Sequence, residues 1–357
     1  KMKRVIAIHL PQYHPFKEND EWWGKGFTEW TNVTKAKPRF RGHYQPHLPA
    51  DMGFYDLRLP EVRQMQADLA KEYGIYGFCY YHYWFNGHRL MERPVSEILS
   101  SGEPDFPFML CWANENWARN WDGGFKNILI EQNYSDDDDR NHMIYLCKEV
   151  FPDKRYIKVD GKPFFTIYKP ELFPNMKRTI DTWRAVAKEY GYDLYLGFME
   201  NPRIDVRKTL AYGFDVAVDF QPTNMGVFLK GKFKIKKLFK KIFHKPFSLI
   251  LDYGHYIDYR ISCPMPDYKQ FPCVSPGWDN SSRRVNKPFM AFVHSTPQLF
   301  GKWLKATLNK FKPYSKDENF VFINAWNEWA EGNHLEPDQK WGRAYLEETR
   351  KAIDSTK

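Results

Sequence analysis

The 357-residue sequence lacks several features that would assign it to a familiar class at once. It contains only five cysteines and no C-x-x-C pair, so we expect neither a disulfide framework nor a cysteine-based zinc site, and a reducing compartment fits best. No apolar run is long enough to cross a bilayer as a helix. No glycine-rich turn or acid-x-acid motif follows a predicted strand, which argues against a nucleotide-binding sheet.

An apolar leader segment is also missing at the start of the sequence. Met2 and two basic residues lead directly into the strand-like run Val5–Ile8. We interpret Met2 as the natural start and Lys1 as an addition, and we expect a cytoplasmic protein, either free or peripheral to the inner membrane. A signal peptide removed earlier would instead indicate a periplasmic protein.

Aromatic residues are abundant, whereas the charge is unevenly spread. Phe, Trp and Tyr make up 18% of the chain, and the 13 Trp suit surfaces that must be both flat and hydrogen-bonding. Of the net charge of +9, eight units come from lysines between Lys230 and Lys245, where no acid occurs. Because the rest of the chain is nearly neutral, we expect no nucleic-acid partner.

Eight extended segments alternate with helical ones along the whole chain. Most of the extended segments are continuous apolar runs, as expected of parallel strands that are covered on both faces. The pentapeptide Ala70–Gly74 recurs as Ala187–Gly191, each time directly before such a segment. The predicted strands are Arg4–His9, Ile75–His82, Phe106–Trp112, Pro163–Tyr168, Asp193–Met199, Asp215–Phe220, Gln270–Ser275 and Phe320–Trp326.

This alternation predicts an α/β protein, a single-domain (β/α)8 TIM barrel over residues 1–357. Long loops follow strands one, three and six. We expect an insertion at residues 224–265, between strands six and seven, that contains the basic segment. In a barrel, the loops after the strands build the functional site.

Two glutamates near the end of the last predicted strand are the strongest sign of chemistry. Glu328 and Glu331 stand three residues apart and are flanked by Trp326 and Trp329. Burial raises the pKa of at least one such carboxyl, and a pair with split pKa values can act as acid and base in turn. The alternative is a helix start, where acidic side chains favour the helix dipole.

Other predicted strands also end in polar and aromatic residues that suit a carbohydrate. Asn114 and Glu115 offer an amide and a carboxylate next to an indole, although Asn114 can equally cap a loop. The loop Trp22–Val33 is either a platform over the barrel mouth or an aromatic cluster that packs the loop itself. The candidate substrate-binding residues are His9, Tyr13, Trp30, Tyr80, His82, Trp112, Asn114, Glu115, Trp278, Asp279, Trp326 and Trp329.

Histidines and aspartates do not form a recognisable metal motif. The spacings of His9, His14, His43, His47, His82 and His88 match no standard ligand pattern, so we predict no metal and no cofactor. Asp136–Asp139 is expected in the first turn of a helix, where negative charge complements the dipole.

The basic segment Lys230–Lys245 has helical amphipathic spacing. Its apolar residues recur on one face, while Lys236, Lys237, Lys240 and Lys241 take the other. Such a helix can lie on an anionic membrane surface, or it can pack its apolar stripe on the barrel and leave the lysines solvated. Both interpretations remain open.

Four strings of the sequence, Trp22–Val33, Tyr80–Gly87, Trp112–Trp117 and Asn324–Gly332, resemble the WbsX-type proteins. These proteins are named as glycosyltransferases of lipopolysaccharide biosynthesis and are related to the family-99 glycoside hydrolases, retaining endo-α-mannosidases with a (β/α)8 barrel. The resemblance covers nearly the whole chain and implies an oligosaccharide or polysaccharide substrate.

The resemblance also implies roles for the two glutamates. Glu328 would take the proton from the sugar's own 2-hydroxyl, so that O2 attacks C1 and forms a 1,2-anhydro intermediate. Glu331 would protonate the leaving oxygen and then activate water. The segment His334–Pro337 resembles a structural segment of the same family.

We therefore predict a retaining glycoside hydrolase for α-mannoside- or α-rhamnoside-type linkages of a bacterial polysaccharide, since these sugars place O2 trans to the leaving group. In a conventional double displacement, Glu115 would be the candidate nucleophile. A glycosyltransferase of lipopolysaccharide, O-antigen or capsule biosynthesis and a noncatalytic carbohydrate-binding barrel are the alternatives. The sequence does not indicate an oligomeric state.

Overall fold

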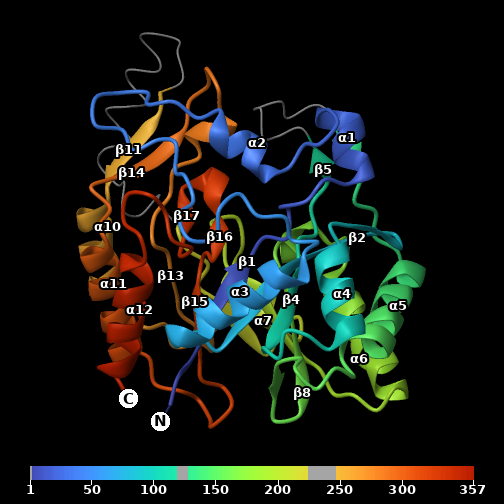
Figure 1. Cartoon of the computed structure of the whole chain (residues 1–357). Coiled ribbons are helices and arrows are strands. Elements are labelled where there is room, and N and C mark those ends of the chain that lie inside the picture. The colour runs from blue at the N-terminus through green and yellow to red at the C-terminus, as the bar shows by residue number, and fades with distance from the viewer. Residues whose placement is uncertain (1, 119–127, 224–246) are drawn as a thin grey trace.

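A nearly closed barrel of parallel strands forms the centre of the computed structural model, which describes residues 2–118, 128–223 and 247–357 (Figure 1). The strand order around the barrel is β12-β10-β9-β8-β4-β2-β1-β15-β13. Their bounds are β1 (Arg4–His9), β2 (Gly77–Phe85), β4 (Phe108–Trp112), β8 (Lys162–Ile167), β9 (Tyr195–Met199), β10 (Val216–Val218), β12 (Gln270–Phe271), β13 (Cys273–Val274) and β15 (Phe320–Ile323).

All eight predicted strands are present, and the seventh is split into two pieces. Pro272 separates β12 from β13 because a proline has no N–H to donate to a strand ladder. β12 pairs with β10 and β13 pairs with β15, so this interrupted segment links the two ends of the curled sheet. The single-domain α/β barrel predicted from the alternating pattern is confirmed.

The main helices surround the barrel (Figure 1). Side-chain caps begin two of them, since the side chains of Asn175 and Thr296 accept hydrogen bonds from the N–H groups of Arg178 and Leu299. These helices are α3 (Pro60–Glu72), α4 (Arg93–Ser101), α5 (Asp136–Tyr145), α6 (Met176–Glu189), α7 (Val206–Leu210), α10 (Tyr253–Ser262), α11 (Pro297–Lys310) and α12 (Ala344–Asp354). Asp136–Asp139 does form the first turn of α5, as predicted.

Except for β7 (Lys158–Val159), which pairs with the first residues of β8, the smaller elements lie at the end of the barrel where its strands terminate. Figure 1 shows α2, β5, β16 and β17 at this upper end, whereas both ends of the chain lie at the lower end. The smaller elements are α1 (Lys17–Trp23), α2 (Glu29–Thr34), β3 (His88–Leu90), β5 (Trp117–Ala118), β6 (Ile128–Ile130), β7 (Lys158–Val159), β11 (Leu249–Asp252), β14 (Met290–Val293), β16 (Asn327–Glu328) and β17 (Asn333–His334).

The described part of the predicted insertion contains β11 and α10. β11 pairs with β14 in a separate parallel two-stranded sheet, which the sequence did not indicate. The predicted basic amphipathic helix at Lys230–Lys245 lies outside the described residues. Within the described ranges, none of the helices has both the length and the apolar character required to cross a membrane.

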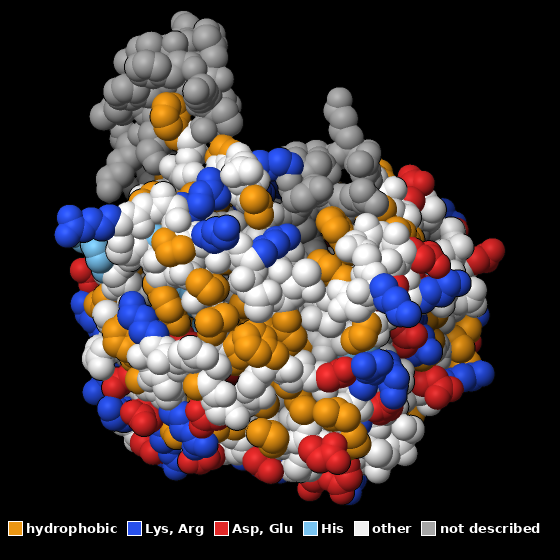
Figure 2. All heavy atoms as spheres, turned by 45° about the horizontal axis from the view of Figure 1, so that its top comes forward, with side chains coloured by type: hydrophobic (Ala, Val, Ile, Leu, Met, Phe, Trp, Pro, Cys, Tyr) orange, Lys and Arg blue, Asp and Glu red, His pale blue; other side chains and the backbone are white. Residues whose placement is uncertain are grey.

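Charge is divided over the upper end of the molecule. Figure 2, which brings this end forward, shows Lys and Arg side chains gathered toward the upper part of the view. Asp and Glu side chains are more frequent along the lower and right-hand rim, and hydrophobic side chains are exposed between the two regions.

Candidate functional site

The two predicted glutamates lie in a hairpin that follows the last barrel strand. β16 and β17 are antiparallel, and a 3₁₀ turn, Trp329–Glu331, joins them. Glu328 directly precedes this turn and Glu331 ends it, and both carboxyl groups contact Arg283. Both line a cavity of about 330 Å³, which we call the acidic cavity.

A glycine allows this hairpin to pack against the loop after the seventh strand. Gly332 has a φ of 56°, and a Cβ added there would lie 2.9 Å from the Cβ of Asp279. The backbone N–H of Asp279 donates to the carbonyl of Glu331 over 2.5 Å. Only a residue without a side chain permits this approach, which fixes the position of Glu331.

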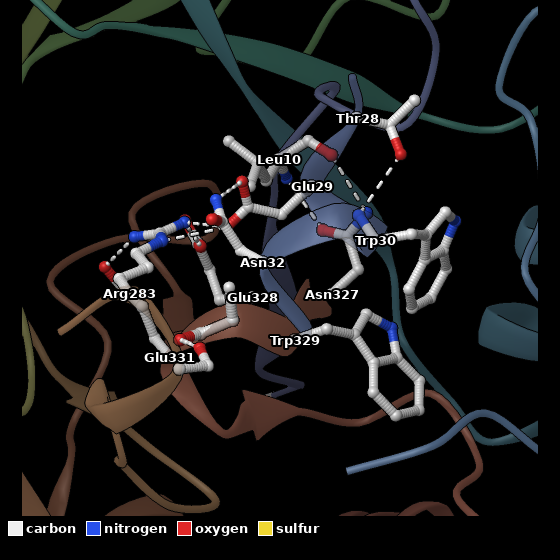
Figure 3. A network of polar contacts seen from close by, with 12 residues as sticks. Leu10, Thr28, Glu29, Trp30, Asn32, Arg283, Asn327, Glu328, Trp329 and Glu331 are labelled. Carbon is white, nitrogen blue, oxygen red and sulfur yellow. Dashed lines mark hydrogen bonds and ion pairs between the residues drawn. The ribbon is translucent and has the colours of Figure 1, made fainter. Parts of the chain in front are cut away.

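Arg283 faces three buried or partly buried carboxyl groups (Figure 3). Its Nε donates to Glu29 over 2.8 Å, and its two terminal nitrogens lie 2.5 Å from Glu331 and 3.4 Å from Glu328. Glu29, from α2, is fully buried. Three negative charges against one guanidinium are unfavourable away from water, so this group retains at least one proton.

Burial and mutual repulsion decide which groups carry the proton. Burial raises the pKa of Glu328 well above its usual value, the charge of Glu331 raises it further, and Arg283 opposes both effects. Burial also raises the pKa of Glu331, against the closer Arg283. In the unliganded chain these contacts favour a proton on Glu328 and a carboxylate at Glu331, and the two groups titrate as a pair.

Aromatic side chains form much of the remaining wall of the acidic cavity. Tyr81 and Tyr83 extend from β2, Tyr168 follows β8, Trp117 begins β5 and Trp278 lies in a loop. Burial raises the pKa of all three tyrosines well above the ordinary value, so their hydroxyls stay neutral and can donate hydrogen bonds. Such rings can stack on sugar faces while their polar groups bind hydroxyls.

Four of the predicted site residues line the acidic cavity: Glu328, Glu331, Glu115 and Trp278. Glu115 forms an ion pair with Lys169. Arg283, Tyr81, Tyr83 and Tyr168 line the cavity as well but were not predicted.

Four other predicted residues support this site from behind. The Tyr13 hydroxyl donates to the carbonyl of Asn327, Trp30 donates to the carbonyl of Tyr55 over 2.9 Å, and Trp329 donates to Glu336 over 2.9 Å. The carboxylate of Asp279 is held by His43 over 2.5 Å. These four residues position the hairpin and its neighbouring loop but are not among the residues that line the cavity.

The remaining predicted residues lie elsewhere. His9 contacts Gln66 over 2.9 Å, His82 contacts His142 over 2.8 Å, and Trp112 donates to the carbonyl of Trp84 over 3.2 Å. Asn114 binds the backbone of Lys169, while the rings of Tyr80 and Trp326 are buried against His9 and Phe78.

Strand alternation explains the positions of two of these residues. Successive side chains of a strand point to opposite faces. Tyr81 and Tyr83 line the cavity, whereas the predicted Tyr80 and His82 lie on the other face of β2 and do not. The period-two pattern shows that Tyr81 and Tyr83 share a face but does not indicate which face meets the cavity. No local pattern indicates Arg283.

Metal-ligand side chains converge at one place outside the acidic cavity. Among the described residues, His47, His334 and Asp338 bring ligand atoms within 4.8 Å of one another. Of these three, only His47 was among the histidines considered in the sequence. His334 and Asp338 come from the end of the chain that follows β16.

A family model described as Glycosyltransferase WbsX matches residues 5–349 of the chain. The chain belongs to the WbsX glycosyltransferase family. Two curated relatives, both named uncharacterized protein WxcX, come from strains of Xanthomonas campestris pv. campestris. They are 41% identical over 353 residues and 40% identical over 358 residues, covering 98% of this chain in each case but 49% of each relative. The WbsX-family chain thus spans about half the length of the curated relatives it matches.

Solved structures share the fold of this WbsX-family chain. The GH99 endo-alpha-mannosidase from Bacteroides thetaiotaomicron has a TM-score of 0.61 and 13% identity, over 100% of this chain and 98% of that one. A glycoside hydrolase-like protein has a TM-score of 0.61 and 14% identity, over 99% and 94%. At such identities the likeness shows the fold alone. Family and fold together confirm the resemblance seen in the sequence and place the chain in a carbohydrate-active enzyme family.

Proposed function

We propose that this WbsX-family chain is a retaining glycoside hydrolase that cleaves α-mannoside- or α-rhamnoside-type linkages in a bacterial polysaccharide. One observation carries the proposal: Glu328 and Glu331 project from one turn into a cavity lined by tyrosine and tryptophan. Burial and mutual repulsion favour a proton on this pair, against the opposing charge of Arg283.

In the proposed first step, Glu328 accepts the proton of the 2-hydroxyl while O2 attacks C1. The bond from C1 to the leaving oxygen breaks, Glu331 protonates that oxygen, and a 1,2-anhydro sugar remains. In the second step Glu331 takes a proton from water, whose oxygen attacks C1. The bond between C1 and O2 opens, and O2 recovers its proton from Glu328. Two inversions at C1 give net retention.

Binding of the sugar must move the proton within the pair. In the free chain, Arg283 favours a proton on Glu328, whereas the first step requires it on Glu331. A sugar 2-hydroxyl that donates to Glu328 stabilises its carboxylate and thereby favours the proton on Glu331. The close contact of Arg283 with Glu331 strengthens the acid, because it lowers the pKa of Glu331 relative to burial alone.

The positions of Glu328 and Glu331, three residues apart in the chain, suit attack by O2 better than they suit a conventional double displacement. A nucleophilic carboxylate would approach C1 from the face opposite the leaving group, about 5–5.5 Å from the acid. Glu115 is the candidate for that role, but its ion pair with Lys169 stabilises its negative charge and weakens it as a nucleophile.

The test uses α-linked mannose and rhamnose oligosaccharides, with released reducing ends as the measurement. Glu331→Gln should lower kcat about 10²–10⁴-fold, since it removes the general acid. An aryl glycoside with a good leaving group needs no protonation, so it should restore the first step in Glu331→Gln but not in Glu328→Gln.

Glu115→Gln is the matched control, because it makes the same isosteric change at another position in the same cavity. We expect it to raise KM more than it lowers kcat. A covalent sugar adduct trapped on Glu115 would contradict the attack by O2.

The family description favours glycosyl transfer as a second candidate function, in lipopolysaccharide, O-antigen or capsule biosynthesis. Product formation that requires a nucleotide-sugar donor, without hydrolysis of any oligosaccharide, would favour this function. Sugar binding without either reaction would instead indicate a noncatalytic carbohydrate-binding barrel.

Contact with an anionic membrane surface through residues 230–245 is a separate proposal, supported only by the sequence of that segment. Binding to vesicles containing anionic lipid should be weak and should fall with added salt. It should disappear when Lys236, Lys237, Lys240 and Lys241 are replaced by Gln. Binding that does not respond to salt would contradict the proposal.

A further inference from the structure

A second cavity, of about 680 Å³, adjoins the same hairpin and shares Trp278 with the acidic cavity. The side chains of His47, His334 and Asp338 line it, and we call it the imidazole cavity. His334 and Asp338 are almost fully buried. The mechanism proposed above uses none of these three residues.

The metal-ligating atoms of His47, His334 and Asp338 are close enough to bind the same ion. His47 Nδ1 lies 2.9 Å from His334 Nε2, which lies 3.7 Å from Asp338 Oδ2. A tetrahedral zinc ion with bonds of about 2.0–2.1 Å separates its ligand atoms by roughly 3.3 Å. Small side-chain movements would therefore bring the three atoms around one centre.

The tautomer of His334 is fixed by its surroundings. Its Nδ1 lies 2.8 Å from the carbonyl oxygen of Glu336, which can only accept, so Nδ1 carries the hydrogen. The Nε2 of the neutral ring therefore presents its lone pair to His47 and Asp338. Burial lowers the pKa of His334, and it lowers the pKa of His47 to about 3, so both rings are neutral at pH 7.

Neighbouring groups hold all three side chains in place. The ring of Tyr44 stacks on His47 at 4.1 Å between centroids, and its hydroxyl donates to Asp338 Oδ2 over 2.8 Å. Trp329 stacks on His334 at 3.7 Å. Metal ligands are typically oriented by such outer contacts, including a histidine that donates its other N–H to a backbone carbonyl.

We propose that His47, His334 and Asp338 bind one divalent transition-metal ion, best matched by Zn²⁺, with a fourth position open to the imidazole cavity. Two neutral imidazoles and a carboxylate form a ligand set that zinc accepts. The ion would replace a hydrogen bond between the two rings, with the proton of His47 moving from Nδ1 to Nε2. It would tie the segment between α2 and α3 to β17 and the residues that follow β17, whichever reaction the acidic cavity performs.

A surface trio of the same residue types provides the control. His294 and His255 both face Asp252, over 2.7 Å and 3.9 Å, but the two imidazole side chains are 78% and 74% exposed. The side chain of His334, by contrast, is 5% exposed. The surface imidazoles each turn toward the carboxylate and are free to reorient, so we expect them to bind zinc weakly.

The full chain, stripped with a chelator and then dialysed against zinc chloride, should retain one equivalent of zinc by mass spectrometry. Its melting temperature should rise by several degrees with zinc, because the ion binds the folded state. Replacement by Co²⁺ should give the intense visible absorption of tetrahedral cobalt. His47→Ala and Asp338→Asn should each weaken zinc binding at least about 100-fold and abolish this absorption, whereas His255→Ala, outside the imidazole cavity, should keep both.

Three results would overturn the proposal. These are a wild-type chain that retains no zinc, unchanged zinc binding in both His47→Ala and Asp338→Asn, and loss of the bound equivalent in His255→Ala. Circular dichroism of the metal-free variants shows whether each one still folds. It thereby separates the loss of a metal-ligating side chain from the loss of the fold. If His47→Ala does not fold, the milder Asp338→Asn and the cobalt spectrum of the wild-type chain decide the question.

Discussion

The two cavities beside the β16–β17 hairpin contain opposite kinds of ionisable side chain. In the acidic cavity, Glu328 and Glu331 face Arg283, and burial raises the pKa of both carboxyls. In the imidazole cavity, burial lowers the pKa of His47 and His334. Burial disfavours the charged form in each case. The same physical cause therefore favours protonated carboxyl groups in one cavity and neutral imidazole rings in the other.

Removal of the Arg283 guanidinium should have the largest effect. Arg283→Met leaves three carboxyl groups without their counter-charge and should lower the free energy of unfolding by about 3 kcal/mol at neutral pH. Urea unfolding measures this loss. Arg284→Gln, at the next position and also lining the acidic cavity, should cost much less. Equal losses in the two variants would show that the carboxyl groups do not depend on Arg283.

A methyl group at Gly332 should disturb both cavities, because this residue lies between Glu331 and His334. Gly332→Ala adds an unfavourable φ and a contact of 2.9 Å with Asp279. We expect a loss of about 2 kcal/mol in the free energy of unfolding. Gly161→Ala is the control, since Gly161 has a φ of 79° but no atom within 4 Å of the added carbon. If both variants lose the same stability, the contact with Asp279 costs nothing.

The raised pKa of Glu328 predicts a smaller, pH-dependent effect. At pH values above 4.5, the ordinary pKa of a glutamate, the folded chain binds more protons at Glu328 than the unfolded chain does. The stabilising contribution of this group is therefore complete below that pH and is lost as the pH rises through the folded-state pKa. The slope is at most about 1.4 kcal/mol per pH unit for each proton.

Glu328→Gln should reduce this slope, as measured by urea unfolding at several pH values from 5 to 8. Glu115→Gln, at a more exposed and ion-paired carboxyl, should keep the slope of the wild-type chain. A Glu328→Gln variant with the wild-type slope would show that the proton is not held at this glutamate.

Local patterns in the sequence were sufficient to predict the strands and helices of the barrel. Continuous apolar runs located the eight barrel strands, and Asp136–Asp139 marked the first turn of a helix. The pair Glu328 and Glu331 was also visible, because its three-residue spacing is a property of neighbours in the chain. These features depend on interactions within a few residues, which a sequence displays directly.

Only the tertiary structure determined what surrounds that pair. Glu29 and Arg283 are 254 residues apart, and His47 and His334 are 287 residues apart, yet each pair is in contact. The choice between Tyr80 and Tyr81 depended on which face of β2 meets the cavity. Such contacts are set by how the barrel closes and how its loops pack, and no local period or cap encodes that arrangement.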